Sequence, residues 1–190
     1  AVAGIHQGWA SAQMIATPVL LVPALRAGAT SLDERIWVTL TPADAELGVE
    51  LAAEQRARGI FSTVVYRAQV SGTLRFPVFD PDALGDLRML WDEALLVAPL
   101  TDQRGAKLDA RVRIDARSFA LLPREKIEIP GLGSTRALVA MLGDALAEPR
   151  AREGLRIDVA YGMRGSGEFL LTSLAHEAKL RITSNWPHPS

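Results

Sequence analysis

The feature that most constrains the fold is a strict alternation of apolar and polar residues across positions 64–76. Apolar or small residues occupy the even positions, and polar or charged residues occupy the odd positions after Val65. Because successive side chains of a β-strand point to opposite faces, this pattern predicts one long strand with a buried face and an exposed face.

The same alternation recurs in four other segments. Their apolar members are Ile36, Val38 and Leu40; Val112 and Ile114; Leu155, Ile157, Val159 and Tyr161; and Ala178, Leu180 and Ile182. Two more continuous apolar runs, 95–100 and 169–174, are typical of interior strands. We therefore predict a mainly β fold of antiparallel sheets, sandwich-like, with one or two short helices.

Helix and turn signals are fewer. Asp80 and Pro81, followed by apolar residues three and four positions apart, predict a short helix over 81–90. Residues 134–148 also have helical spacing, although glycines at 131, 133 and 143 leave a strand or an irregular segment open. Turn-forming residues at 102–105 and 162–167 are expected to separate strands.

Composition narrows the class of protein. The 190 residues fit one domain, 1–190, and Lys+Arg of 21 against Asp+Glu of 22 leave no basic field for nucleic acid. The absence of cysteine excludes disulfides, iron–sulfur clusters and thiol catalysis. The most apolar stretch, 15–25, is interrupted by Pro18 and Pro23 and falls short of the roughly 20 residues that cross a bilayer.

The residues that could hold a metal do not form a complete pattern. The histidines at positions 6, 176 and 188 have no second histidine at ligand spacing, and His176 is expected in a solvated turn. Residues 80–91 match part of a calcium loop, but Leu84 and Trp91 stand where oxygen ligands are required. We predict no metal and no cofactor.

Other chemical motifs are equally incomplete. Glycines at 162, 165 and 167 favour a hairpin over a phosphate loop, and Ser166 lacks the flanking spacing of a nucleophile elbow. Trp37 lies on the polar side of an expected strand, so it is either an exposed platform for a ligand or a cover for the sheet.

The C-terminal segment Ser184-Asn185-Trp186-Pro187-His188-Pro189-Ser190 is unusual, because its prolines prevent the strand from continuing. It resembles the C-terminal signature of the CreD family, inner-membrane proteins of Gram-negative bacteria linked to envelope integrity. Further positions fit that family in the same order: Trp9, Gln13, Pro18, Val19, Leu20, Val22 and Pro23; Glu54, Arg56, Arg58, Gly59, Ile60 and Phe61; Val65 and Tyr66; and the turn-like segments 102–105 and 164–166.

The resemblance has gaps. Thr17 stands where the family commonly has glycine, and residues 118–154 contain no motif that matches. Family members carry a transmembrane segment before this region and several after it, and this sequence contains none of them. The resemblance therefore implies a periplasmic fragment that is tethered to the inner membrane through segments absent from this chain.

For function, the resemblance implies the output of a two-component system and a link to colicin tolerance and β-lactam susceptibility, without an established reaction. We predict a non-enzymatic periplasmic domain that binds an envelope component or a partner protein. The candidate binding residues are Trp186, His188, Arg56, Arg58 and Trp37. The first expectation for the terminal segment is a structural seal, after a strand whose Leu180 and Ile182 face the core.

Two alternatives stay open at this point. One is a hydrolase or transferase of envelope polymers with an acid–base pair such as Asp92 and Glu93, although neighbours on one strand would point to opposite faces. The other is a structural spacer between membrane helices, which a domain without a concave pocket would favour.

Overall fold

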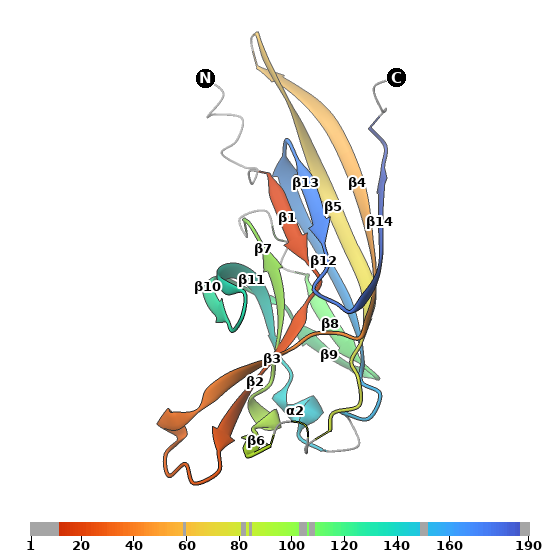
Figure 1. The fold of residues 1–190 in the computed structure, drawn as a ribbon. Coiled ribbons are helices and arrows are strands. Elements are labelled where there is room, and N and C mark those ends of the chain that lie inside the picture. The colour runs from red at the N-terminus through yellow and green to blue at the C-terminus, as the bar shows by residue number, and fades with distance from the viewer. Residues whose placement is uncertain are drawn as a thin grey trace.

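Two β-sheets dominate the computed structural model, which describes residues 12–58, 60–80, 83, 85–102, 106, 109–148 and 152–186, the side chains at 58 and 61 excepted. The six-stranded sheet has the order β14-β4-β5-β12-β8-β9. Its strands are β4 (Asp44–Arg58), β5 (Phe61–Arg75), β8 (Arg111–Ile114), β9 (Arg117–Ala120), β12 (Arg156–Ser166) and β14 (Glu177–Ser184). The predicted mainly β class is confirmed (Figure 1).

The eight-stranded sheet has the central order β10-β11-β7-β1-β13, and β2 joins it to β3 and β6. Its strands are β1 (Gln13–Ala16), β2 (Val19–Arg26), β3 (Ile36–Leu40), β6 (Leu87–Met89), β7 (Leu95–Leu100), β10 (Leu122–Ile129), β11 (Gly133–Met141) and β13 (Phe169–Thr172). Most pairings in both sheets are antiparallel, whereas β1 with β13 and β4 with β14 run parallel. Short helical turns η1 (Leu32–Glu34), η3 (Trp91–Glu93) and α2 (Gly143–Leu146) connect the strands.

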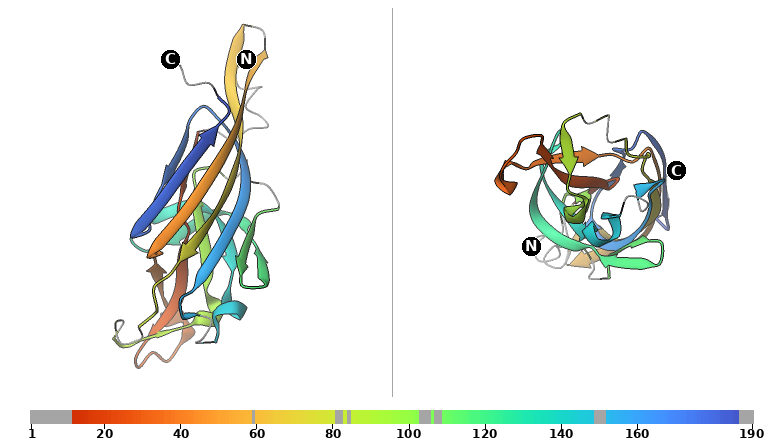
Figure 2. Two further views of the ribbon diagram at one scale, coloured as in Figure 1. Left: turned by 90° about the vertical axis from the view of Figure 1, so that its right-hand side faces the viewer. Right: turned by 90° about the horizontal axis from the view of Figure 1, so that it is seen from below.

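The main core lies between the two sheets. It combines Leu20, Leu96 and Leu138 of the eight-stranded sheet with Val70 and Ile157 of the six-stranded one. Strand β5 has the predicted two faces, since Val70 and Leu74 are fully buried while the alternating polar residues Arg67, Gln69 and Ser71 are exposed. Seen from below, the strands of both sheets surround this interior (Figure 2).

The β4–β5 hairpin projects beyond the rest of the fold at one end of the molecule (Figure 1). Its pairing is continuous from Asp44 opposite Arg75 to Arg58 opposite Phe61. Ile60 in its turn is 94% exposed. The left view of Figure 2 shows β14, β4, β5 and β12 side by side along this elongated sheet.

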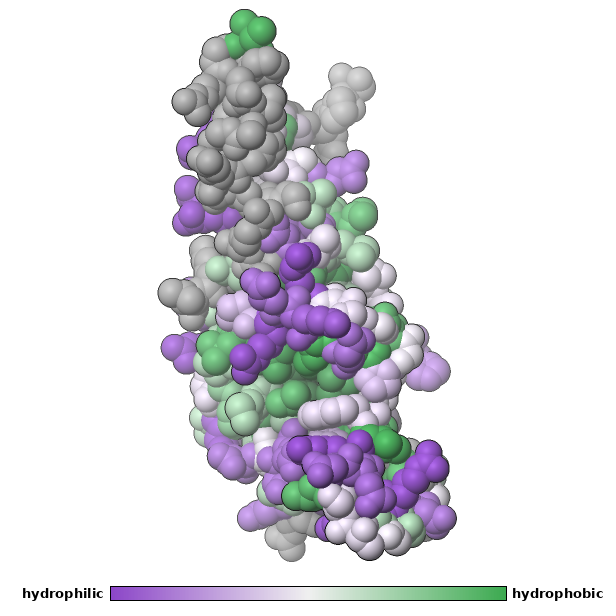
Figure 3. All heavy atoms as spheres, turned by 90° about the vertical axis from the view of Figure 1, so that its left-hand side faces the viewer, coloured by the Kyte–Doolittle hydropathy of each residue, from purple (hydrophilic) through white to green (hydrophobic). Residues whose placement is uncertain are grey.

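A second, smaller apolar cluster covers the outer face of the eight-stranded sheet. It contains Val19, Leu21 and Val97 under Ile129 from the curled β10–β11 hairpin. Apolar side chains are visible on this side of the molecule in Figure 3. Met14 and Leu170 are partners in the β1–β13 register, and both are more than half exposed on this sheet.

The predicted helix over 81–90 is wrong for residues 85–90; Ala83 lies in a 3-10 turn, and residues 81, 82 and 84 lie outside the described residues. Residues 87–89 form strand β6 instead, and Leu25 of β2 is the partner of Arg88. Gly85 adopts a φ of 57°, which breaks a right-handed helix, and β2 offers an edge with which the chain pairs. In residues 134–148, the strand that the glycines left open is β11, and helix is limited to the single turn α2.

The predicted turn at 162–167 is also wrong over most of its length. Residues 162–166 continue strand β12 and pair with β5, and the chain turns only at Gly167, whose φ is 75°. Gly165 lies opposite Tyr66, and a Cβ at this position would collide with the phenol oxygen of Tyr66. Glycine here serves close packing between neighbouring strands, not a turn.

The core-facing assignment of β14 is a further error. Every residue of this strand is exposed, Leu180 by 38% and Ile182 by 45%. Strand β14 lies at the edge of its sheet, and its exposed side chains show that the core between the sheets does not reach this strand. Strand β13, expected in the interior, has an exposed face as well, with Leu170 56% exposed.

Candidate functional site

A pocket opens between the two sheets at the end of the molecule that is opposite the hairpin. Its volume is about 510 Å³, within the range of roughly 300–1,000 Å³ that is typical of ligand sites. The lining comes from β2 and β3 of the eight-stranded sheet and from connecting segments, several of which directly flank strands of the six-stranded sheet: Leu20, Thr39, Leu40, Thr41, Ala43, Phe76, Pro77, Val78, Phe79, Asp80, Ala83, Trp91, Arg152, Leu155 and His176.

The floor of the pocket is part of the main core. Leu20, Phe76 and Leu155 line the pocket and are also buried members of that core. Val78 at the same pocket is 69% exposed. The pocket therefore runs from a buried apolar floor to apolar surface that is in contact with water.

Two aromatic side chains form one wall. Phe79 and Trp91 meet edge to face, with ring centroids 4.9 Å apart and an angle of 80° between the planes. Trp91 begins the short helix η3 and is only 9% exposed. Gly143 packs so closely on the Asp92 carbonyl that a Cβ would collide with it, so α2 holds η3 in place from behind.

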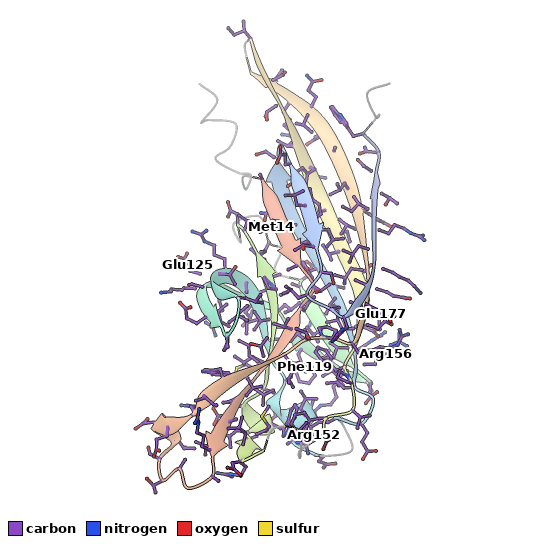
Figure 4. The ribbon with its side chains drawn as sticks, viewed as in Figure 1. Met14, Phe119, Glu125, Arg152, Arg156 and Glu177 are labelled. Atoms are coloured by element: carbon purple, nitrogen blue, oxygen red, sulfur yellow. The ribbon has the colours of Figure 1, made fainter. Side chains whose placement is uncertain are left out.

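Arg152 supplies the positive charge of the pocket. Its guanidinium carbon lies 4.8 Å from the centre of the Trp91 ring, a distance typical of cation–π contact. Burial lowers the pKa of this guanidinium. Within the described part of the chain, Arg152 forms no ion pair with a carboxylate. Figure 4 shows Arg152 at the end of the molecule where α2 lies.

Besides Arg152, four polar residues line the pocket: Thr39, Thr41, Asp80 and His176. Thr41 is exposed, and the backbone N–H of His176 donates to the carbonyl of Pro42 at 3.0 Å, which attaches the loop before β14 to the loop after β3. The prediction of a turn at His176 is confirmed. Asp80 also lines the pocket and has an interaction of its own.

The predicted binding residues do not form one site. Trp37 is 39% exposed on β3, whereas Arg56 lies near the turn of the β4–β5 hairpin, opposite Thr63, and pairs with Glu54 at 2.6 Å. The side chain of Arg58 and all of His188 lie outside the described residues. Trp186 is 36% exposed beside the end of β14.

The alternative acid–base pair is not directed at the pocket. Asp92 and Glu93 belong to the short helix η3, not to a strand, and Glu93 pairs with Arg35 at 2.5 Å. Neither residue lines the pocket. In the described ranges, no group of three His, Asp or Glu side chains is arranged to hold a metal ion.

Several family-like residues have a structural task instead, in which a side chain binds distant backbone. The buried amide of Gln13 donates to the Asp102 carbonyl at 2.6 Å and accepts from its N–H at 3.2 Å. The Asn185 amide accepts from the Ala53 N–H at 2.7 Å and donates to the Ala53 carbonyl at 3.3 Å. We call these side chains, together with Tyr66, the backbone anchors.

Tyr66 is the third backbone anchor. Its hydroxyl donates to the carbonyl of Glu168 at 2.8 Å, and its ring contacts Phe169 edge to face at 5.7 Å. Burial raises the pKa of this phenol to about 12, although a hydrogen bond with the Gln13 backbone acts in the opposite direction.

The described part of the terminal segment supports the predicted structural seal, because Asn185 holds this segment to the backbone of Ala53.

The sequence did not predict the pocket. Arg152 and Phe79 belong to no motif, and no spacing in the sequence links Trp91 to either of them. The three residues lie in separate connections, and only the packing of the two sheets brings them together. The strongest available signal was the run of apolar and aromatic residues at 76–79, directly after the long strand.

The fold and its pocket define a class, the two-sheet β domain with a ligand-sized pocket between the sheets. The family model described as "Inner membrane protein CreD" matches residues 1–190. The chain therefore belongs to the CreD family of inner membrane proteins, as the resemblance predicted.

A curated relative gives the same assignment. The chain is 23% identical over 137 residues to Inner membrane protein CreD of Escherichia coli (strain K12). The match covers 72% of this chain and 29% of the length of the E. coli protein. No solved structure matches the chain. Among the described residues, no helix combines the length and apolar character needed to span a membrane.

Proposed function

We propose that this chain is a periplasm-facing, non-enzymatic binding domain of a CreD-type inner membrane protein. Its pocket between the sheets takes up an envelope component, and this binding supports envelope integrity during exposure to β-lactams or colicins. The observation that carries the proposal is the pocket of about 510 Å³, with an apolar floor in the core and with Arg152 against Trp91; no carboxylate of the described residues forms an ion pair with this arginine.

The composition of the pocket favours binding. Large apolar side chains supply most of the contact area that a ligand would bury, and a few polar groups fix its orientation. Arg152 costs free energy in its partly desolvated position, because burial disfavours the charged form of the side chain. A ligand with an opposite charge would offset that cost, so this arginine supports a site with a charged ligand.

Blocking the pocket in the full-length protein tests the proposal. Thr41 is exposed and lines the pocket, so Thr41→Trp places a large ring there with little effect on the core. The control is Ser62→Trp, which adds the same ring to an exposed position on the hairpin strand β5. The measurement is growth of a strain lacking its own copy of the gene in β-lactam or colicin, with equal protein levels in the membrane.

We expect Thr41→Trp to lose protection and Ser62→Trp to retain it. Full protection by a correctly folded Thr41→Trp protein would overturn the proposal. Thermal unfolding of both variants of the 190-residue chain shows whether the fold is intact.

A further inference from the structure

The pocket combines two surfaces that suit different parts of one ligand. Its floor is aliphatic and aromatic, with Leu20, Leu155 and Phe76 shared with the core. Its wall carries the guanidinium of Arg152, 4.8 Å from the Trp91 ring centre. A purely apolar ligand would leave this cation without a partner, and a small anion would leave the floor unfilled.

Arg152 and Asp80 are oppositely charged residues of the pocket lining. Arg152 has no ion pair in the part of the chain that the structure describes, whereas the acidic lining residue, Asp80, has an interaction of its own. The cation–π contact with Trp91 holds the guanidinium at the pocket wall, and a guanidinium is well suited to bind a carboxylate or a phosphate. Exposed Val78 adds apolar surface that the same ligand would cover.

We infer that the pocket takes the alkyl chain of an acidic, single-chain amphiphile, whose carboxylate or phosphate head is bound by Arg152. This inference rests on the proposed function, since it names the class of ligand for the same pocket. The alkyl chain extends the apolar core, and the head forms the charge-assisted hydrogen bonds that Arg152 lacks.

The test uses the 190-residue chain with Trp9, Trp37 and Trp186 replaced by phenylalanine, so that Trp91 is the only tryptophan and reports on the pocket. The probes are laurate, dodecyl phosphate, neutral dodecyl maltoside and cationic dodecyltrimethylammonium, all below the concentrations at which they form micelles. We expect the two anions to change Trp91 fluorescence saturably. We also expect each of them to bind at least about tenfold more tightly than the neutral or the cationic probe.

Two arginine variants test the role of the head group. Arg152→Gln should weaken both anions about tenfold and leave dodecyl maltoside unchanged, whereas Arg152→Lys, which keeps the charge, should lose less. A preference for laurate or for dodecyl phosphate identifies a fatty acid or a phospholipid-derived head as the source of the anion. Either preference supports the inference.

A series of fatty acids from octanoate to palmitate tests the alkyl chain. Affinity should rise about fourfold for each added methylene group and then level off when the pocket is full. Equal binding of all four head groups, or unchanged laurate binding in Arg152→Gln, would overturn the inference. Failure of every probe would overturn it too, while the protection assay with Thr41→Trp still decides the proposed function independently.

Discussion

The two ends of the molecule are built by different means. At the hairpin end, long strands are paired continuously, and three side chains, Gln13, Tyr66 and Asn185, bind the backbone of distant segments. At the pocket end, the space between the sheets is lined by side chains from connecting segments, such as Trp91 and Arg152, which contact each other instead of the backbone of a distant strand. All three backbone anchors belong to segments that resemble the family, whereas the pocket wall belongs to none. The family-like motifs of this chain therefore contain residues that hold the fold together. The candidate binding site becomes visible only in the three-dimensional packing of the two sheets.

The largest expected effect tests the hairpin end. Gly165→Ala places a methyl group against the Tyr66 ring, which must move and lose its hydrogen bond to Glu168. We expect a decrease of about 1–3 kcal/mol in the free energy of unfolding, measured by urea denaturation. The control is Gly48→Ala, because a Cβ at Gly48 would lie 3.9 Å from the Ser71 carbonyl oxygen, an ordinary van der Waals distance. Equal stability of the two variants would show that Tyr66 is not an anchor.

A smaller loss is expected when Asn185 is replaced. Asn185→Ala removes two hydrogen bonds to Ala53 and should cost about 1 kcal/mol, since these bonds are exposed to water. The effect should be local, so hydrogen exchange at the Ala53 amide should accelerate while exchange in β12 stays unchanged. Faster exchange throughout the sheet would contradict a local seal. Thr183→Ala is a useful control, because its longer side-chain bond to the Val49 carbonyl, at 3.4 Å, contributes less.

A stabilising substitution is expected in the core between the two ends. The hydroxyl of Tyr161 is fully buried and has no hydrogen-bond partner among the described residues, and burial raises its pKa. Tyr161→Phe removes the unsatisfied group and keeps the ring, so stability should rise by up to about 1 kcal/mol. Thermal unfolding measures the change. A clear loss of stability would mean that the hydroxyl has a partner in solution, such as a bound water molecule.

The contrast between the two ends also explains what the sequence could predict. Strand β5 was predicted because its alternation records which face is buried, and that signal is local. Strand β14 has the same alternation, yet Leu180 and Ile182 are exposed, because burial also depends on whether the opposing sheet extends that far. The segment 87–89 became a strand through pairing with β2, a long-range contact that outweighs local helix propensity. The pocket is formed entirely by such long-range contacts, so no local sequence pattern predicts that Arg152 lines it.

The smallest expected effect concerns ionic contacts on the six-stranded sheet, beside the pocket end. Burial acts to raise the pKa of Asp158, but hydrogen bonds from Thr73 and Arg113 and the charge of Arg156 hold the pKa below its usual range. A carboxyl group with a lowered pKa in the folded state stabilises the fold above its unfolded pKa, and this contribution is lost as the pH falls through the folded value. Asp158→Asn should therefore be less stable than the natural chain at pH 7, by under about 1 kcal/mol because the partners are exposed.

Below about pH 4, where the aspartate becomes protonated in the unfolded state before it does in the folded state, the difference between Asp158→Asn and the natural chain should shrink. Thermal unfolding at a series of pH values measures this change, and Glu125→Gln, which alters an exposed acid on β10, controls for general charge effects. A difference that stays constant from pH 7 to pH 3 would show that Asp158 acts through packing or neutral hydrogen bonds. In that case hydrogen bonds of defined geometry would stabilise the pocket end as they stabilise the hairpin end. The presence of the pocket would then be the difference that remains between the two ends.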